Sequence, residues 1–215
     1  MAVKAIFFDL DGTLLNTIND IKDAVNDALK DCGVPYFYDD IRKFIGNGAP
    51  ALAHRALGEY DGEDMYQKFM DSYLPKYEAY QGRTTSPYPQ VHDTLLQLAK
   101  RGVSLFVYSN KPDFLTQEII RQKLGDIPFS GITGHKKGAP TKPDPSHLLE
   151  EMKKHSFKPD ECIMIGDSLP DLETAKNAGI RGGLCLWGYG KYDDALLEKA
   201  DFLFKNACEW EALLS

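Results

Sequence analysis

Short apolar segments that alternate with helical patterns constrain the fold of this chain more than any other feature. Residues 3–8, 103–108, 162–165 and 183–187 are four such segments, and none shows strict alternation of polar and apolar residues. This pattern is typical of strands that are buried on both faces of a parallel sheet. Turn-like or acidic residues and then a helical pattern follow each segment. The alternation predicts an α/β fold built on a doubly wound, mostly parallel sheet.

The section between residues 16 and 85 has a different pattern. Apolar residues recur there at helical spacing, as in Ile21, Val25 and Leu29, and no convincing buried strand is present. Pro87 and Pro89 mark the point where the chain returns to the α/β pattern. The predicted division is an α/β core domain of residues 1–15 and 86–215 and a small all-helical domain of residues 16–85.

The overall charge limits the kinds of partner that the chain can bind. Its formal net charge is −7 at pH 7, whereas nucleic-acid surfaces need clustered Lys and Arg. No apolar segment is as long as a membrane span, and Asp9 and Asp11 interrupt the N-terminal segment too early for a signal peptide. We therefore expect a cytoplasmic protein that binds a small molecule and neither nucleic acid nor membrane. Either a monomer or a dimer is expected, since the sequence does not distinguish them.

Polar residues follow the apolar segments at the positions where open α/β sheets bind ligands, outside the carboxyl ends of the strands. They comprise Asp9 and Asp11 after the first segment, Ser109 and Asn110 after the second, Lys142 in a loop, and Asp167 and Asp171 after the third. Phosphoryl transfer needs an in-line nucleophile, neutralisation of the non-bridging oxygens and a proton for the leaving oxygen. This set of side chains can supply all three.

The two aspartates after the first segment suit covalent chemistry on phosphorus. The carboxylate of Asp9 can attack phosphorus and form an acyl phosphate that water then hydrolyses. Asp11 can give a proton to the departing alkoxide. Gly12 and Thr13 predict a tight turn that leaves backbone N–H groups free.

A cation is required because the acidic cluster alone would repel a phosphate. Asp9 and Asp167 are hard oxygen ligands of the kind that Mg²⁺ takes. Ser109 can donate a hydrogen bond to a phosphate oxygen, and the ammonium of Lys142 can neutralise its charge. We expect Asp171 to orient Lys142 or a metal-bound water, although the helix dipole favours an aspartate at the start of any helix.

Four ordered motifs in the chain resemble those of the haloacid dehalogenase superfamily. They are Asp9-Leu-Asp11-Gly-Thr13, Ser109-Asn110-Lys111, Lys142-Pro143 and Gly166-Asp167-Ser-x-x-Asp171. The resemblance spans nearly the whole chain, and it implies a Rossmann-like core with a helical cap inserted after the first motif. It implies a phosphatase rather than a dehalogenase, because the dehalogenases lack the second aspartate of the first motif, here Asp11.

The resemblance also implies a role for each matching residue. The nucleophile would be Asp9, and the general acid and base would be Asp11. The other implied roles are phosphate binding by Ser109, Asn110 and Lys142, Mg²⁺ binding by Asp9, Asp167 and the backbone carbonyl of Asp11, and supporting roles for Thr13 and Asp171.

Residues 44–52 of the expected cap are similar to the cap segment of phosphoglycolate phosphatases, which makes phosphoglycolate the favoured substrate. Arg55 could reach the carboxylate of that substrate, although an arginine on an amphipathic helix is usually solvated or paired at the surface. The spacing of Gly46 and Gly48 superficially matches a dinucleotide fingerprint. No buried strand precedes these glycines, so we expect a cap loop there and no NAD site.

Several other functions remain open. A nucleotidase, a pyrophosphatase or a sugar phosphatase would have the same core motifs, because selectivity depends on cap side chains. A β-phosphoglucomutase-like phosphomutase would use the same chemistry, but such enzymes typically carry a different residue at the position of Thr13. A metal- and phosphate-binding regulatory module is the non-enzymatic alternative. It is disfavoured because no catalytic position of the four motifs is substituted.

Overall fold

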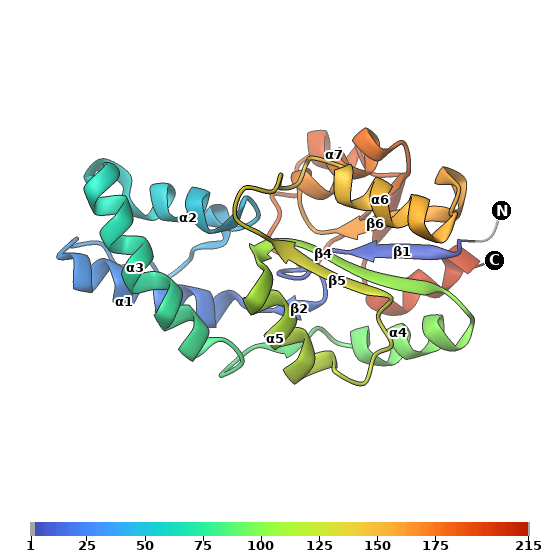
Figure 1. Cartoon of the computed structure of the whole chain (residues 1–215), viewed down its shortest axis with the longest axis horizontal. Helices are drawn as coiled ribbons and strands as arrows, with labels where there is room; N and C mark the ends of the chain where they lie inside the picture. Colours follow the sequence, from blue (N-terminus) through green and yellow to red (C-terminus); the bar gives the residue numbers. More distant parts are fainter. Residues whose placement is uncertain (1–2, 215) are drawn as a thin grey trace.

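The computed structural model describes residues 3–214 and contains a six-stranded sheet with the order β5-β4-β1-β6-β7-β8. The strands are β1 (Ala5–Phe8), β4 (Ser104–Pro112), β5 (Gly131–His135), β6 (Cys162–Gly166), β7 (Arg181–Cys185) and β8 (Phe202–Phe204). All neighbouring pairs in this sheet are parallel. The structure therefore confirms the predicted α/β fold. The carboxyl ends of the central strands point toward the helical part of the chain at the left of Figure 1.

Helices cover both faces of the sheet. The flanking helices are α4 (Val91–Lys100), α5 (Asp113–Leu124), α6 (Ser146–His155) and α7 (Leu169–Ala178). Ile6 and Phe8 of β1 belong to an apolar cluster with side chains from α4 and α5, whereas Phe7 belongs to a cluster with side chains from α6 and α7. Alternate residues of β1 are therefore buried against different helices, which explains why the segment is apolar without alternation.

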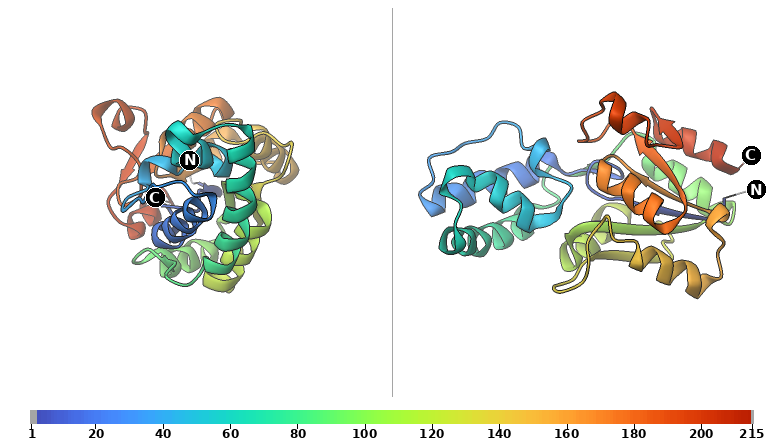
Figure 2. Two further views of the ribbon diagram at one scale, coloured as in Figure 1. Left: turned by 90° about the vertical axis from the view of Figure 1, so that its left-hand side faces the viewer. Right: turned by 90° about the horizontal axis from the view of Figure 1, so that it is seen from above.

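A helical unit is inserted between β1 and β4. It consists of α1 (Ile18–Cys32), α2 (Gly48–Leu57) and α3 (Glu63–Tyr80). Its helices form an apolar cluster that also includes Leu115 of α5. They project from the carboxyl edge of the sheet, as Figures 1 and 2 show. The short strands β2 (Leu15–Asn16) and β3 (Ser86–Pro87) pair antiparallel where the chain leaves and re-enters the core. A two-stranded ribbon therefore joins the helical unit to the core.

Some elements differ from the sequence-based expectation. Strand β7 begins and ends two residues earlier than the apolar segment 183–187, and the edge strands β5 and β8 are additional. The remaining short elements are α8 (Asp194–Leu197) and the 3₁₀ helices Arg42–Phe44, Gly58–Tyr60, Pro159–Glu161 and Ala207–Leu214. Within residues 3–214, no helix combines the length and the apolar character needed to cross a membrane.

Candidate active site

The carboxyl edge of the sheet brings together side chains from three neighbouring strands. Asp9 directly follows β1, and its backbone N–H donates to the carbonyl of Ile165 on β6 at 2.9 Å. Asp167 directly follows β6. The sequence predicts Ser109 and Asn110 after a strand, but they lie within the last part of β4, where the pairing with β5 is irregular. These residues meet because β4, β1 and β6 are adjacent and parallel.

Lys142 forms a buried ion pair with two carboxylates. Its Nζ lies 2.6 Å from Oδ1 of Asp9 and 2.6 Å from Oδ1 of Asp171. Burial raises the pKa of Asp9 to about 7, although Lys142 opposes this shift. Burial also opposes the charge on Lys142, but Asp171 and Asp9 outweigh it and raise the pKa of Lys142 above its usual value. Lys142 is therefore charged, and it favours the ionised form of Asp9.

Asp167 is a second buried carboxylate beside this ion pair. Its Oδ2 accepts a hydrogen bond from the backbone N–H of Tyr189 at 2.6 Å. Burial, together with the charges of Asp171 and Asp9, raises the pKa of Asp167 well above its ordinary value. Carboxylate oxygens of Asp9, Asp167 and Asp171 lie within 4.8 Å of one another. Repulsion within this group is therefore strong when all its members are ionised.

The acidic cluster fits a hard divalent cation such as Mg²⁺. Its donors are carboxylate oxygens, which Mg²⁺ prefers, and their combined negative charge exceeds the single positive charge of Lys142. Asp171 already contacts Lys142 through Oδ1, and its Oδ2 accepts hydrogen bonds from the backbone N–H and hydroxyl of Ser168 at 3.1 and 2.8 Å. Asp9 and Asp167 are therefore better placed than Asp171 to bind a metal.

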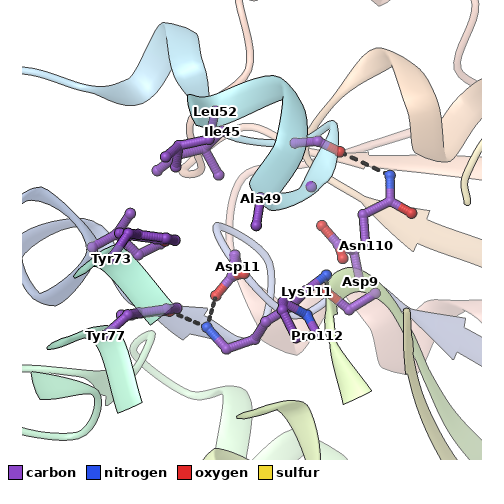
Figure 3. Close-up of a pocket in the computed structure, with 14 residues that line it drawn as sticks. Asp9, Asp11, Ile45, Ala49, Leu52, Tyr73, Tyr77, Asn110, Lys111 and Pro112 are labelled. Atoms are coloured by element: carbon purple, nitrogen blue, oxygen red, sulfur yellow. Dashed lines mark hydrogen bonds and ion pairs between the residues drawn. The ribbon is translucent and has the colours of Figure 1, made fainter. Parts of the chain in front are cut away.

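Asp11 faces a different buried lysine. Nζ of Lys111, on β4, lies 3.4 Å from Oδ1 of Asp11 and also donates to the hydroxyl of Tyr77 on α3, as Figure 3 shows. The ammonium lies 4.1 Å from the centre of the Tyr77 ring. Burial lowers the pKa of Lys111, and Asp11 partly offsets that shift. Asp9 and Asp11, two residues apart, therefore have different cationic partners.

The turn after β1 is tight, as predicted, but some of its backbone N–H groups donate to carbonyls within the turn. The N–H of Gly12 donates to the carbonyl of Leu15 at 2.9 Å, and the N–H of Thr13 donates to the carbonyl of Leu10 at 3.3 Å. The N–H groups of Gly12 and Thr13 are therefore not among those that the turn leaves free. Gly12 has a φ of 87°, and a Cβ at this position would contact the carboxylate of Asp167. Thr13 is fully buried in the turn.

Asn110 connects the loop of Lys142 to the helical unit. Its Oδ1 accepts a hydrogen bond from the backbone N–H of Lys142 at 2.8 Å, and its Nδ2 donates to the carbonyls of Lys142 and Gly46 at 3.2 and 3.0 Å. Asn110 therefore positions the backbone of Lys142. Ser109 is buried, and its Oγ accepts a hydrogen bond from the backbone N–H of Lys111 at 3.3 Å. The hydroxyl of Ser109 can still donate a hydrogen bond to a ligand.

A pocket lies between the core and the helical unit at this edge of the sheet (Figure 3). The core contributes most of its polar side chains, and the helical unit contributes mainly apolar and aromatic ones. The lining residues are Asp9, Asp11, Ile21, Ile45, Gly46, Gly48, Ala49, Leu52, Tyr73, Tyr77, Ser109, Asn110, Lys111 and Pro112. The pocket therefore suits a small ligand whose reactive end faces Asp9 and Asp11.

Arg55 is engaged in the loop that precedes α2. Its guanidinium donates to the carbonyl of Phe44 at 3.1 Å and to Oδ1 of Asn47 at 2.7 Å. The side chain lines a neighbouring cleft that also includes Asp167 and Tyr189. Arg55 therefore stabilises the loop. Among the described residues that line the pocket in Figure 3, the cationic side chain is that of Lys111 and not that of Arg55.

The structure brings three further residues to the site. Lys111 belongs to one of the four motifs, but the sequence does not show that its side chain is buried. Tyr77 follows Phe69 and Tyr73 at helical spacing, and this aromatic stripe is the signal that could have indicated a buried face on α3. Tyr189 lies in the loop after β7, and only the tertiary structure shows that it contacts Asp167.

The sequence and the fold are similar to those of known phosphatases. Residues 6–184 match the haloacid dehalogenase-like hydrolase family. The phosphoglycolate phosphatase of Aquifex aeolicus (strain VF5) is 33% identical over 195 residues, which cover 90% of each protein. That of Vibrio parahaemolyticus serotype O3:K6 is 31% identical over 214 residues, which cover 96% of this chain and 94% of that protein.

Solved structures extend the similarity to the whole chain. The crystal structure of a predicted phosphoglycolate phosphatase from Haemophilus somnus 129pt superposes with a TM-score of 0.92 at 29% identity, and the match covers 99% of this chain and 98% of that chain. These similarities confirm the resemblance that the four motifs carry. The chain belongs to the haloacid dehalogenase-like hydrolase family and is a phosphatase of that family.

Proposed function

We propose that the protein is a magnesium-dependent phosphoglycolate phosphatase that works through an aspartyl phosphate on Asp9. The observation that carries this proposal is the buried contact of Asp9 with Lys142 at 2.6 Å, beside Asp167 and two residues before Asp11. The names of the relatives from Aquifex aeolicus and Vibrio parahaemolyticus support phosphoglycolate as the substrate.

In the first step, the carboxylate of Asp9 attacks phosphorus in line with the ester oxygen. The bond between phosphorus and the ester oxygen breaks, and Asp11 gives its proton to the departing alkoxide, which leaves as the free alcohol. The ammonium of Lys142 stabilises the negative charge on the transferring group, because it is buried and charged next to Asp9.

In the second step, water hydrolyses the aspartyl phosphate. Asp11, now ionised, takes a proton from the attacking water, and the bond between Asp9 and phosphorus breaks to release inorganic phosphate. Ser109 and Lys142 bind the phosphate oxygens in both steps, while Asn110 positions Lys142 through its backbone. Asp171 orients the ammonium of Lys142 through their contact at 2.6 Å.

Mg²⁺ would be bound by the carboxylates of Asp9 and Asp167 and by the backbone carbonyl of Asp11. When bound, it supplies positive charge that reduces repulsion between the acidic cluster and the phosphate dianion. The fit of the donor set supports this assignment, because Asp9 and Asp167 are buried with fewer positive than negative charges around them.

The helical unit acts as a cap over the site in this proposal. Its contacts with the core at the reaction centre support this role, since Tyr77 contacts Lys111 and the carbonyl of Gly46 accepts a hydrogen bond from Asn110. Covering the pocket would exclude bulk water while the aspartyl phosphate forms. The cap would also limit the substrate to a small ester, because its apolar side chains line the pocket.

A substrate panel tests the proposed function. Phosphate release from phosphoglycolate, nucleoside monophosphates, pyrophosphate and sugar phosphates would be ranked by kcat/KM with Mg²⁺ and again with EDTA. We expect phosphoglycolate to rank first and all release to stop in EDTA and return with added Mg²⁺. A higher rank for pyrophosphate, a nucleotide or a sugar phosphate would refute the substrate assignment, and undiminished activity in EDTA would refute the metal requirement.

A further inference from the structure

Lys111 is the only cationic side chain among the described residues that line the pocket between the core and the helical unit. Its side chain is 2% exposed. Asp9, Asp11 and Ser109 line the same pocket, so the ammonium of Lys111 faces the space that a bound ester would occupy (Figure 3). The proposed reaction assigns Lys111 no role, since Lys142 is the ammonium that contacts the nucleophile.

The described partners of Lys111 are few for a buried ammonium. Its Nζ donates to the hydroxyl of Tyr77 and lies 3.4 Å from Oδ1 of Asp11, which is long for a charge-assisted hydrogen bond. A buried ammonium is costly unless it is paired and fully hydrogen-bonded. Ile45, Ala49 and Leu52, which the helical unit contributes to the pocket, are apolar and cannot pair with it. The site is therefore open to one more anionic acceptor.

The other carboxylate in the pocket does not supply that acceptor. Besides Asp11, only Asp9 contributes a carboxylate to the described lining of the pocket, and Asp9 contacts Lys142. An anionic group on the substrate itself would supply a further acceptor at the leaving-group side of the ester, next to Asp11.

We propose that Lys111, together with the hydroxyl of Tyr77, binds a carboxylate on the leaving group and so selects phosphate esters of short hydroxy acids. This inference rests on the proposed function and deepens it, because it names the residues that recognise the acid. A carboxylate accepts hydrogen bonds from both an ammonium and a hydroxyl, and the small, partly apolar pocket suits a short carbon chain between the two anionic ends.

The two binding groups come from different parts of the fold. Lys111 lies on β4 of the core, whereas Tyr77 lies on α3 of the helical unit. A carboxylate bound by both would therefore contact the core and the helical unit at once. Arg55, which the sequence offered for the same carboxylate, donates instead to Phe44 and Asn47.

The test compares two esters that differ in one charge. Phosphoglycolate carries the carboxylate, and 2-hydroxyethyl phosphate carries a neutral hydroxymethyl group in its place. In Lys111→Met we expect kcat/KM for phosphoglycolate to fall at least about 30-fold more than kcat/KM for 2-hydroxyethyl phosphate, mainly through KM. Lys100→Met, on an exposed lysine of α4, is the matched control. It should leave unchanged the ratio of kcat/KM for phosphoglycolate to kcat/KM for 2-hydroxyethyl phosphate.

Tyr77→Phe keeps the ring and removes the hydroxyl. If Lys111→Met does not fold, this variant tests whether the carboxylate of the substrate is bound at this position. We expect the ratio of the two kcat/KM values to fall about 3- to 10-fold in this variant. Equal losses on both esters in Lys111→Met, or an unchanged ratio in Tyr77→Phe, would overturn the proposal and assign Lys111 to the support of Asp11.

The wild-type protein separates this inference from the proposed function. If it hydrolyses both esters with Mg²⁺ but does not prefer phosphoglycolate, carboxylate recognition is wrong and the phosphatase mechanism stands. If it hydrolyses phosphoglycolate in preference, and Lys111→Met keeps that preference, only the assignment to Lys111 is wrong. If it hydrolyses neither ester, the proposed function fails, and the inference fails with it.

Discussion

At the scale of the residue, the chemistry depends on two aspartates that are close in sequence and differ in surroundings. Asp9 is buried and contacts Lys142 at 2.6 Å, whereas Asp11 lies 3.4 Å from Lys111 and its side chain is 13% exposed. Lys142 favours the ionised form of Asp9 and so opposes the effect of burial, and the ionised form is the one that attacks phosphorus. A carboxyl with looser contacts is suited to exchange protons with a substrate or with water.

Asp11→Asn tests the acid–base role. The amide cannot give or take the proton, so we expect kcat for phosphoglycolate to fall about 10²- to 10⁴-fold. The leaving nitrophenolate of p-nitrophenyl phosphate needs less protonation, so kcat/KM, which reports the first step, should fall less on that ester. Asp160→Asn, on an exposed aspartate of the 3₁₀ helix before β6, is the control. A loss below about tenfold on phosphoglycolate would contradict the assignment.

At the scale of the element, the loop after β7 holds the side chain of Asp167 in position. The backbone N–H of Tyr189 donates to Oδ2 of Asp167, and a Cβ at Gly188 would contact both that carboxylate and the carbonyl of Gly12. The hydroxyl of Tyr189 also accepts a hydrogen bond from the backbone N–H of Thr17 at 2.6 Å. The loop therefore connects the carboxylate of Asp167 to the start of the helical unit.

Gly188→Ala should displace Asp167 because the added methyl group has no room. We expect the Mg²⁺ concentration for half-maximal activity to rise about 10- to 100-fold, the range found when a group that orients a metal ligand is lost. Gly62→Ala is a matched control, since nothing lies within 4 Å of a Cβ at that position. An unchanged Mg²⁺ dependence in Gly188→Ala would argue against Asp167 as a ligand.

Asp20 joins α1 to the chain that returns to the core. Its carboxylate accepts hydrogen bonds from the backbone N–H groups of Gly82, Thr84 and Thr85 at 2.8, 2.9 and 3.1 Å. The hydroxyls of Thr84 and Thr85 donate to it at 2.6 and 2.7 Å. Burial alone would raise the pKa of Asp20, but these hydrogen bonds outweigh it and lower the pKa below its ordinary value.

Asp20→Asn should lower the free energy of unfolding by about 1–3 kcal/mol, because an amide cannot accept all of these hydrogen bonds. Since the pKa of Asp20 is lowered in the folded state, its stabilisation is present above the ordinary value of 3.8 and is lost as the pH falls through the folded-state value. Denaturant unfolding at a series of pH values from 7 downward measures this loss of stability. Equal stability of Asp20→Asn and the exposed-site control Asp23→Asn would contradict the prediction.

At the scale of the whole molecule, the site lies where two parts of the fold meet. The helical unit packs around an apolar cluster to which the core contributes Leu115 of α5, and the short pair of strands β2 and β3 joins the unit to the core. A short two-stranded connection permits a change of angle between the two parts. We expect the unit to close on the substrate, with residues 14–17 and 86–89 as the hinges.

Crystal structures with and without Mg²⁺ and a fluoride-based phosphate analogue would measure this closure. The angle between the helical unit and the sheet should be smaller in the complex, because the analogue adds contacts that exist only when both parts surround it. Small-angle scattering of the same two states in solution is the control for lattice forces. An identical angle in both crystals and an identical radius of gyration in solution would refute closure.

The core of the sheet was predictable because its strands are buried on both faces. Apolar character without alternation identifies β1, β4 and β6 directly. Strand β5 was not predictable, since it lies at the edge of the sheet and Gly131 and Gly134 interrupt its pattern. The start of β7 was missed because Arg181 is charged and Gly182 is a poor strand former.

The site was predictable only as far as it follows from the order of the strands. Asp9 and Asp167 meet because their strands end at one edge of the sheet, as the predicted parallel sheet implies. Lys142 lies in the loop after β5, so only the resemblance of the motifs placed it at the site. Lys111 and Tyr77 could not be paired from the sequence, because their contact depends on how α3 packs against the core. The hydrogen bonds inside the turn at Gly12 were likewise invisible, since they depend on backbone geometry.

The turnover of phosphoglycolate by Asp9→Asn with Mg²⁺ tests the central claim most directly. Asparagine keeps the size of the side chain and its contact with Lys142, but its amide cannot attack phosphorus. Thermal unfolding of the variant verifies that it folds. We predict that phosphate release falls to the level of a blank without enzyme while the unfolding transition stays cooperative. Release at the wild-type rate by the folded variant would contradict the assignment of Asp9 as the nucleophile.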